Sequence, residues 1–248
     1  MKIHEKLYAH ALPLAENRRI QTATVGLKYT AVSLDDGSLG VSYTWNQGHC
    51  CGPMEEAFRD YEDEKAQVLL EKIREDGPVG RSLAVALLNA LNSSRALAMP
   101  LDKDNSILFD ALKLKEGSFL AMVGFFKPVV KLLRDIKVEL YIIDHSHNMG
   151  SADELYGIVK EKAEALIVTS TTIVNGSFDE IMEHCPAGLP IAMLGPTTPM
   201  IPEVFTDYGI SFLAGTAPDK IDLTMRLLRQ GAGTPDFQKH ARKVYCFV

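Results

Sequence analysis

The sequence lacks the features that would place the protein in a membrane or on nucleic acid. No apolar run reaches the roughly 18 residues that a membrane-spanning helix needs. Lys and Arg number 26 against 32 Asp and Glu, so the net charge is −6 and the basic excess of a nucleic-acid binder is missing. The first residues carry Glu5, His10 and Glu16 among their apolar positions, which is not the pattern of a signal peptide. We therefore expect a cytoplasmic protein with neither a nucleic-acid nor a membrane partner.

Cysteine is scarce, with four residues in the chain. Cytoplasmic cysteines are expected to be thiols, and Cys50 and Cys51 are sequence neighbours, a poor arrangement for a structural disulfide. Cys185 and Cys246 are expected to pack in apolar surroundings. The remaining composition, 46% hydrophobic and 23% charged, is that of an ordinary globular protein. At 248 residues, the chain corresponds to one large domain or two small ones.

Residues 1–98 have the pattern of a small α+β lobe. Alternation of apolar and polar residues predicts strands with one buried face, and helical spacing predicts the segments around them. The expected elements are a helix over 2–16, strands over 24–31 and 39–46 joined by a turn at 35–38, and helices over 55–74 and 80–92. The polar segment 99–117 is expected to connect this lobe to the next.

Residues 118–248 alternate between short apolar strands and helices, which predicts a Rossmann-like α/β lobe with a parallel sheet covered by helices on both faces. The expected strands span 119–125, 138–144, 165–170, 190–195 and 210–215, and the tail 231–248 could add an edge strand. Ligands of such sheets bind beyond the carboxyl ends of the strands, near the point where the strand order reverses. The loops after the five strands are therefore the places to look for function.

The loop after the first of these strands disfavours the common dinucleotides. A fingerprint for NAD or FAD needs G-x-G-x-x-G, and only Gly124 is present. Asp144 follows 20 residues later at the end of the second strand, where a ribose-binding carboxylate would fall. The alternative for Asp144 is a carboxylate that caps the next turn.

Hydroxyl side chains gather after the third and fourth strands. The third strand ends in Thr-Ser-Thr-Thr (169–172), and Gly-Pro-Thr-Thr-Pro (195–199) follows the fourth. Hydroxyls and backbone amides can bind an anion without net positive charge, and prolines preorganise a loop for binding. These loops therefore favour a small anionic or polar ligand, with ordinary short turns as the alternative.

Soft metal ligands occur in two groups. One is His49, Cys50 and Cys51, and the other is His145 and His147. Thiolate and imidazole suit a divalent transition metal, and the groups could meet in one cleft if the first loop folds over the sheet edge. Neither group has a recognised metal spacing. The alternative is solvent-facing histidines and unrelated thiols.

The motifs of the second lobe, in this order, resemble a prokaryotic family of unknown function described as a putative heavy-metal-chelation domain. The resemblance rests on VGFFKP (123–128), Asp144, TSTTIVNG (169–176) and GPTTP (195–199), and it covers nearly the whole chain. It implies an enolase-N-terminal-like lobe joined to a Rossmann-like lobe, with a site in the cleft between them. The matching positions, which the resemblance implies as ligand contacts, are Gly124, Phe126, Pro128, Asp144, Thr171, Thr172, Asn175, Gly195, Thr197, Thr198 and Pro199.

Three functions are open at this point. The first is a protein that binds a small anionic ligand or a metal chelate in the interlobe cleft, with a role in handling a metal-binding compound. The second is an enzyme with a nucleotide-like cofactor, such as a group transferase, in which Asp144 holds a ribose. The third is a non-catalytic assembly module. Whichever function holds, a homodimer is the generic expectation for the assembly of the protein.

Overall fold

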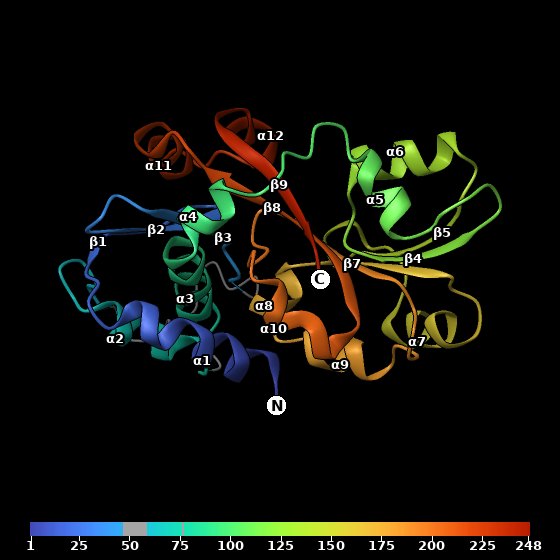
Figure 1. The fold of residues 1–248 in the computed structure, drawn as a ribbon, viewed down its shortest axis with the longest axis horizontal. Helices are drawn as coiled ribbons and strands as arrows, with labels where there is room; N and C mark the ends of the chain where they lie inside the picture. The colour runs from blue at the N-terminus through green and yellow to red at the C-terminus, as the bar shows by residue number, and fades with distance from the viewer. Residues whose placement is uncertain (47–58, 76) are drawn as a thin grey trace.

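The computed structural model describes residues 1–46, 59–75 and 77–248, and these form two sheets with their helices (Figure 1). The smaller sheet is antiparallel with the order β1-β2-β3, and the larger has the order β5-β4-β6-β7-β8-β9. The strands are β1 (Ile20–Val25), β2 (Tyr29–Leu34), β3 (Leu39–Tyr43), β4 (Phe119–Val123), β5 (Glu139–Ile143), β6 (Ala165–Thr169), β7 (Ile191–Leu194), β8 (Ile210–Pro218) and β9 (Ala241–Phe247). The expected fold class, a small α+β part followed by an α/β part, is confirmed.

The helices are short, and none in the described part of the chain is long and apolar enough to cross a membrane. They are α1 (Ile3–Ala15), α2 (Ala66–Leu70), α3 (Pro78–Leu91), α4 (Ser93–Leu97), α5 (Ser106–Ala111), α6 (Lys127–Asp135), α7 (Ala152–Glu161), α8 (Thr171–Asn175), α9 (Phe178–Glu183), α10 (Pro202–Phe205), α11 (Ile221–Arg229) and α12 (Thr234–Phe237). Four short 3-10 turns are interspersed, η1 (Glu71–Ile73), η2 (His145–His147), η3 (Thr206–Tyr208) and η4 (Gln238–His240), all within the described residues.

In the smaller sheet, the predicted turn at 35–38 is confirmed between β2 and β3, but the strand predicted before it is wrong. The alternating run 24–31 is not one strand, because the chain turns at Gly26 between β1 and β2. A Cβ on Gly26 would lie 2.6 Å from the carbonyl oxygens of Tyr29 and Leu228, so only glycine fits where this turn touches α11. Alternation continues through the tight turn, and for this reason the pattern alone does not separate the two strands.

The helix expected over 55–74 is shorter within the described residues, where helical structure begins only at Ala66. The segment before it runs beside the start of β1 instead. The amide of Asp63 donates to the Ile20 carbonyl at 2.8 Å, and the Ala66 amide donates to the Arg18 carbonyl at 2.9 Å. These bonds pair the segment before α2 with the chain around the start of β1. The first four residues of the expected helix lie outside the described part.

The larger sheet is sandwiched between helices, as Figure 1 shows for α5 and α6 on one face and α7 and α9 on the other. Strands β4 to β8 are parallel, and β9 adds an antiparallel edge, as expected for the tail. Alternate side chains of β4 divide between the faces: Leu120 and Met122 pack with α5 and α6, and Ala121 packs in the opposite core. Both faces are therefore apolar, which explains the continuous apolar runs of these strands.

The C-terminal helices return to the smaller sheet. Met225 and Leu228 of α11 and Phe237 of α12 pack against the β2 and β3 residues that face away from α3. The ring of Phe237 lies edge-on to Tyr29 at 4.9 Å between centroids. An early hairpin and late helices of the chain thus pack together, and Figure 1 shows α11 above β2.

The two parts also share one continuous core and several hydrogen bonds across their seam. The Tyr43 amide at the end of β3 donates to Thr197 Oγ1 at 2.8 Å. Asn89 of α3 donates to the carbonyls of Val41 and Thr197. The carboxylate of Asp179 accepts from the first amide of α1 at 3.0 Å, acting as its cap from the other part of the chain. Any cleft along this seam is therefore held in shape by direct contacts.

Candidate functional site

A cavity of about 480 Å³ lies at the carboxyl ends of the parallel strands. In the order β5-β4-β6, the chain leaves β4 to one side and returns on the other, so the strand order reverses between β4 and β6. This is the position at which sheets of this kind bind ligands. The walls come from three places: the strand-end loops of the larger sheet, the β2–β3 side of the smaller sheet, and the segment from α12 to β9.

Two glycines bring the strand ends close together at the cavity. Gly124 after β4 has φ +93°, and a Cβ there would lie 2.9 Å from the Thr169 Cβ. Gly195 after β7 has φ +126°, and a Cβ there would lie 2.9 Å from Ser170 Oγ. Both glycines line the cavity. They supply a backbone conformation that other residues rarely adopt and leave open the space that a side chain would fill.

The hydroxyl run after β6 is mostly occupied in shaping its own loop. Thr172 Oγ1 donates to the Thr169 carbonyl at 2.7 Å, and the hydroxyls of Thr169 and Thr171 lie 2.9 Å apart. The Thr171 amide also donates to Thr169 Oγ1. These bonds form the start of α8, a helix that the sequence did not predict. Thr171 and Thr172 line the cavity as expected, but their hydroxyls have partners within the loop.

Ser170 differs from its neighbours. It is fully buried and lines the cavity, and its Oγ has no hydrogen-bond partner among the described residues. Ser170 is the N-cap residue of α8, yet its side chain makes no capping bond. Sequence reasoning placed it in the hydroxyl run but chose Thr171 and Thr172 as contacts, because nothing in the sequence shows which hydroxyl stays unpartnered.

The second threonine motif is split by the fold. Thr197 lines the cavity, and its hydroxyl accepts the seam hydrogen bond described above. Thr198 is buried behind the loop, where its Oγ1 donates to the Gly195 carbonyl at 2.7 Å. Neither Thr198 nor Pro199 lines the cavity. The motif thus contributes Gly195 and Thr197 to the surface and Thr198 to the support of the loop.

Asp144 lines the cavity but has its carboxylate engaged by the protein. One oxygen accepts from the Phe125 amide at 2.7 Å, and the other accepts from the His147 amide at 3.1 Å and lies 2.9 Å from His147 Nδ1. Burial raises the pKa of Asp144, but the hydrogen bonds from His147 and Phe125 lower it by more. The pKa of Asp144 is therefore below its ordinary value. Asp144 thus holds the β4 and β5 loops together and caps η2.

The expected metal ligands do not gather in the described part of the chain. His145 lines the cavity, whereas His147 is half exposed, pairs with Asp144 and does not line it. Among the described residues, no group of three or more His, Cys, Asp or Glu side chains is placed to hold a metal ion. His49, Cys50 and Cys51 lie outside the described residues.

Three further predicted contacts, Phe126, Pro128 and Asn175, do line the cavity. Asn175 Oδ1 already accepts hydrogen bonds from both the amide and the hydroxyl of Ser177.

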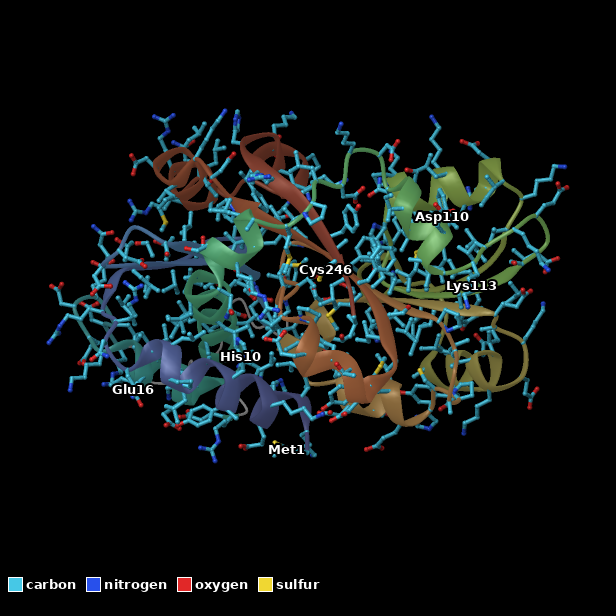
Figure 2. The ribbon with its side chains drawn as sticks, viewed as in Figure 1. Met1, His10, Glu16, Asp110, Lys113 and Cys246 are labelled. Carbon is cyan, nitrogen blue, oxygen red and sulfur yellow. The ribbon has the colours of Figure 1, made fainter. Side chains whose placement is uncertain are left out.

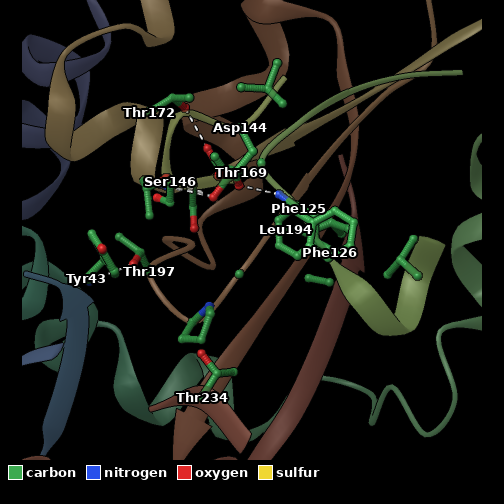
Figure 3. Close-up of a pocket in the computed structure, with 18 of the residues that line it drawn as sticks. Tyr43, Phe125, Phe126, Asp144, Ser146, Thr169, Thr172, Leu194, Thr197 and Thr234 are labelled. Atoms are coloured by element: carbon green, nitrogen blue, oxygen red, sulfur yellow. Dashed lines mark hydrogen bonds between the residues drawn. The ribbon is translucent and has the colours of Figure 1, made fainter. Parts of the chain in front are cut away.

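Several lining residues come from segments that sequence reasoning did not connect with the site. Figure 3 shows Tyr43 beside Thr197 on one side of the cavity, Phe125, Phe126 and Leu194 together on another, and Thr234 of α12 apart from both groups. Tyr29, Tyr43, Thr234, Gln238 and Lys243 line the cavity without a local motif that marks them. Trp45 and Thr216, which follows the fifth expected strand, also line it. Tyr29 and Tyr43 come from the smaller sheet, whereas Thr234, Gln238 and Lys243 come from α12, η4 and β9.

The remaining cysteines are structural. Cys185 and Cys246 are half-buried against the main core, as expected, and burial raises the pKa of each thiol to about 11. Figure 2 shows Cys246 near the middle of the molecule on β9. A thiol with so high a pKa is protonated at neutral pH and is a poor nucleophile or metal ligand.

Fold and cavity together define a two-part α/β protein with a ligand-sized cavity where the strand order reverses. Two family models match the chain, DUF4213 over residues 8–92 and DUF364 over residues 107–247, and both carry the description "putative heavy-metal chelation". The chain therefore belongs to this family, as the sequence motifs suggested.

Solved structures of the same family share the fold. A DUF364-family protein of unknown function from Pyrococcus horikoshii superposes with a TM-score of 0.81 at 22% identity, covering 100% of both chains. One from Desulfitobacterium hafniense gives 0.78 at 15% identity, covering 99% of this chain and 98% of that one. An uncharacterized protein of Methanocaldococcus jannaschii is 25% identical over 171 residues, which are 66% of this chain and 65% of the relative's length.

Proposed function

We propose that the protein binds a small anionic ligand or metal chelate in the cavity, and that any metal arrives as part of the ligand. The observation that carries this proposal is Ser170. A buried hydroxyl without a partner costs about 1–3 kcal/mol, and such groups in native proteins call for an explanation. A ligand atom seated above Gly195 would supply the missing partner, since no Cβ fills that space.

The chelate form of the proposal is supported by the donors that face the cavity. Its described lining offers hydroxyls, amides and aromatic rings, and the histidine and carboxylates present do not form a metal-binding group. Hydroxyls are weak ligands for a bare transition metal but good partners for the oxygens of an organic ligand. The family description, heavy-metal chelation, is compatible with a protein that handles the chelating compound.

The alternative of an enzyme with a nucleotide-like cofactor would place a ribose on the carboxylate of Asp144. Both oxygens of that carboxylate accept hydrogen bonds from the adjoining loops, so Asp144 also has a role in holding these loops.

The test is calorimetry with Ni²⁺, Zn²⁺ and Co²⁺ as free ions, with their citrate complexes, and with citrate alone, combined with native mass spectrometry of the protein as purified. We expect either a copurified small molecule or heat from citrate or its complexes, in each case reduced by Ser170→Ala. Thr224→Val is the matched control, because Thr224 Oγ1 is also buried with no partner among the described residues but lies on α11, outside the cavity lining.

Two results would contradict the proposal. One is binding of the free ions that survives Ser170→Ala, which would place a metal directly on other residues. The other is a protein without any copurified molecule that also gives no heat with citrate or its complexes.

A further inference from the structure

The charge on the cavity wall is distributed unevenly. The charged side chains in its described lining are Asp102, Asp144 and Lys243, and His145 lines it as well. Asp144 is engaged by the loops, as described above. Lys243 of β9 is the single lysine or arginine among the described residues that line the cavity. Lys127, which begins α6, does not line it.

Lys243 is held in position by the connection between the two parts of the chain. Its Nζ donates to Asn105 Oδ1 at 3.1 Å and lies 3.8 Å from Asp102 Oδ2. Asp102 in turn accepts from the Asn105 amide at 2.8 Å, and its own amide donates to the Lys243 carbonyl at 2.9 Å. The Asp102 carboxylate is nearly buried, whereas the Lys243 side chain is 34% exposed.

The ammonium group keeps capacity for a further partner. It has three N–H donors; Asn105 accepts one, and the Asp102 oxygen at 3.8 Å is beyond the ordinary hydrogen-bond range. A cation fixed by its neighbours and facing a cavity loses little side-chain entropy when an anion binds. Lys243 is therefore prepared to receive one negative group of a ligand.

The cavity lining beside the strand ends is apolar, in contrast to the charged lining at Lys243. Phe125, Phe126 and Leu194 gather on one side of the cavity (Figure 3), and Val123 and Pro128 extend the same apolar lining. Aromatic rings bind flat apolar bodies by stacked or edge-on contact. An aromatic ring on the ligand would suit this apolar lining, and the single cation of the same cavity favours a single negative charge.

We propose that the cavity takes an aromatic carboxylate, with its carboxylate on Lys243 and its ring against Phe125 and Phe126. A polar substituent on the ring would reach Ser170. This inference rests on the proposed function, that the cavity binds a small anionic compound. It adds the chemical class of that compound and assigns Lys243 as the residue that pairs with its charge.

Salicylate and salicylamide are the probes that test it. Both carry the ring and the ortho hydroxyl, and they differ in the charge of one substituent. By calorimetry at low salt, we expect the wild-type protein to prefer salicylate by about tenfold or more, which corresponds to about 1.4 kcal/mol. Lys243→Gln is expected to lose this preference, Lys243→Arg to keep most of it, and Lys127→Gln, which removes the same charge away from the cavity, to leave it unchanged.

Circular dichroism and the melting temperature identify any variant that fails to fold. If Lys243→Gln fails to fold, the preference of Lys243→Arg for salicylate is compared with that of the wild-type protein. Equal affinity of the wild-type protein for the two probes would overturn the inference, as would a preference that persists in folded Lys243→Gln. Absence of binding by both probes would also overturn it. None of these outcomes affects the proposed function, whose own test uses metals, citrate complexes and the protein as purified.

Discussion

Replacing Ser170 with alanine is expected to stabilise the ligand-free protein and to weaken its ligand binding. The Ser170 side chain is buried, and its Oγ has no partner among the described residues. The substitution removes one oxygen and adds no atom, so it introduces no clash with Gly195. It also removes no capping bond from α8, because none is present.

The size of the effect follows from the cost of an unpaired buried hydroxyl, about 1–3 kcal/mol. The small void left by the oxygen offsets part of this gain. A net increase of about 1 kcal/mol in the free energy of unfolding corresponds to a rise of about 2–4 °C in melting temperature for a chain of this size. Most substitutions at fully buried positions lower stability, so the sign itself is informative.

The assay is urea and thermal unfolding of the ligand-free protein, paired with the binding measurements described above. Thr224→Val is expected to give a similar gain in stability with unchanged ligand binding, since its buried hydroxyl is also unpartnered. Ser82→Ala is the opposite control: Ser82 Oγ donates to the Pro78 carbonyl and accepts from the Trp45 amide, so its loss is expected to destabilise the protein by about 1 kcal/mol or more. If Ser170→Ala destabilises the protein as Ser82→Ala does, then the Ser170 hydroxyl has a structural partner and the reasoning is refuted.

Three further predictions concern residues near the cavity. Thr197→Val is expected to lower the free energy of unfolding by about 1–3 kcal/mol in urea melts, because the Tyr43 amide loses its acceptor; an unchanged melt would mean that this bond does not hold the seam. The lowered pKa of Asp144 means that its carboxylate stabilises the fold above the unfolded value near 4 and that this stability is lost as the pH falls through the lower folded pKa. Asp144→Asn is therefore expected to flatten the dependence of melting temperature on pH below about pH 4, and an unaltered acid slope would contradict the assignment. Asp179→Ala is expected to cost about 1 kcal/mol by removing the cap of α1 without changing ligand binding, as hydrogen exchange of the first turn of α1 would show.

The sequence predicted the parts of the site that are local and failed at the parts that depend on packing. Gly124 and the loops after β6 and β7 could be located because strand–helix alternation fixes where the strands end, and the carboxyl ends of parallel strands share one edge. Lys243 and Tyr43 reach the same cavity only because β9 and the smaller sheet pack beside that edge. Nothing within a few residues of either marks this proximity. The turn at Gly26 was missed for a related reason, since the carbonyls that require glycine include one from α11.

The threonine motifs that first suggested a binding site are largely the scaffold of that site. The hydroxyls of Thr172 and Thr198 donate to carbonyls of their own loops, and that of Thr197 accepts an amide from the smaller sheet. Such bonds give the loops one conformation at little cost in ligand-binding entropy, because the ordering occurs on folding. What they hold in place is a buried hydroxyl at Ser170 beside Gly195, where a Cβ would lie 2.9 Å from that hydroxyl. In a loop rich in hydroxyls, the hydroxyl that the loop itself does not use is therefore the one we propose for the ligand.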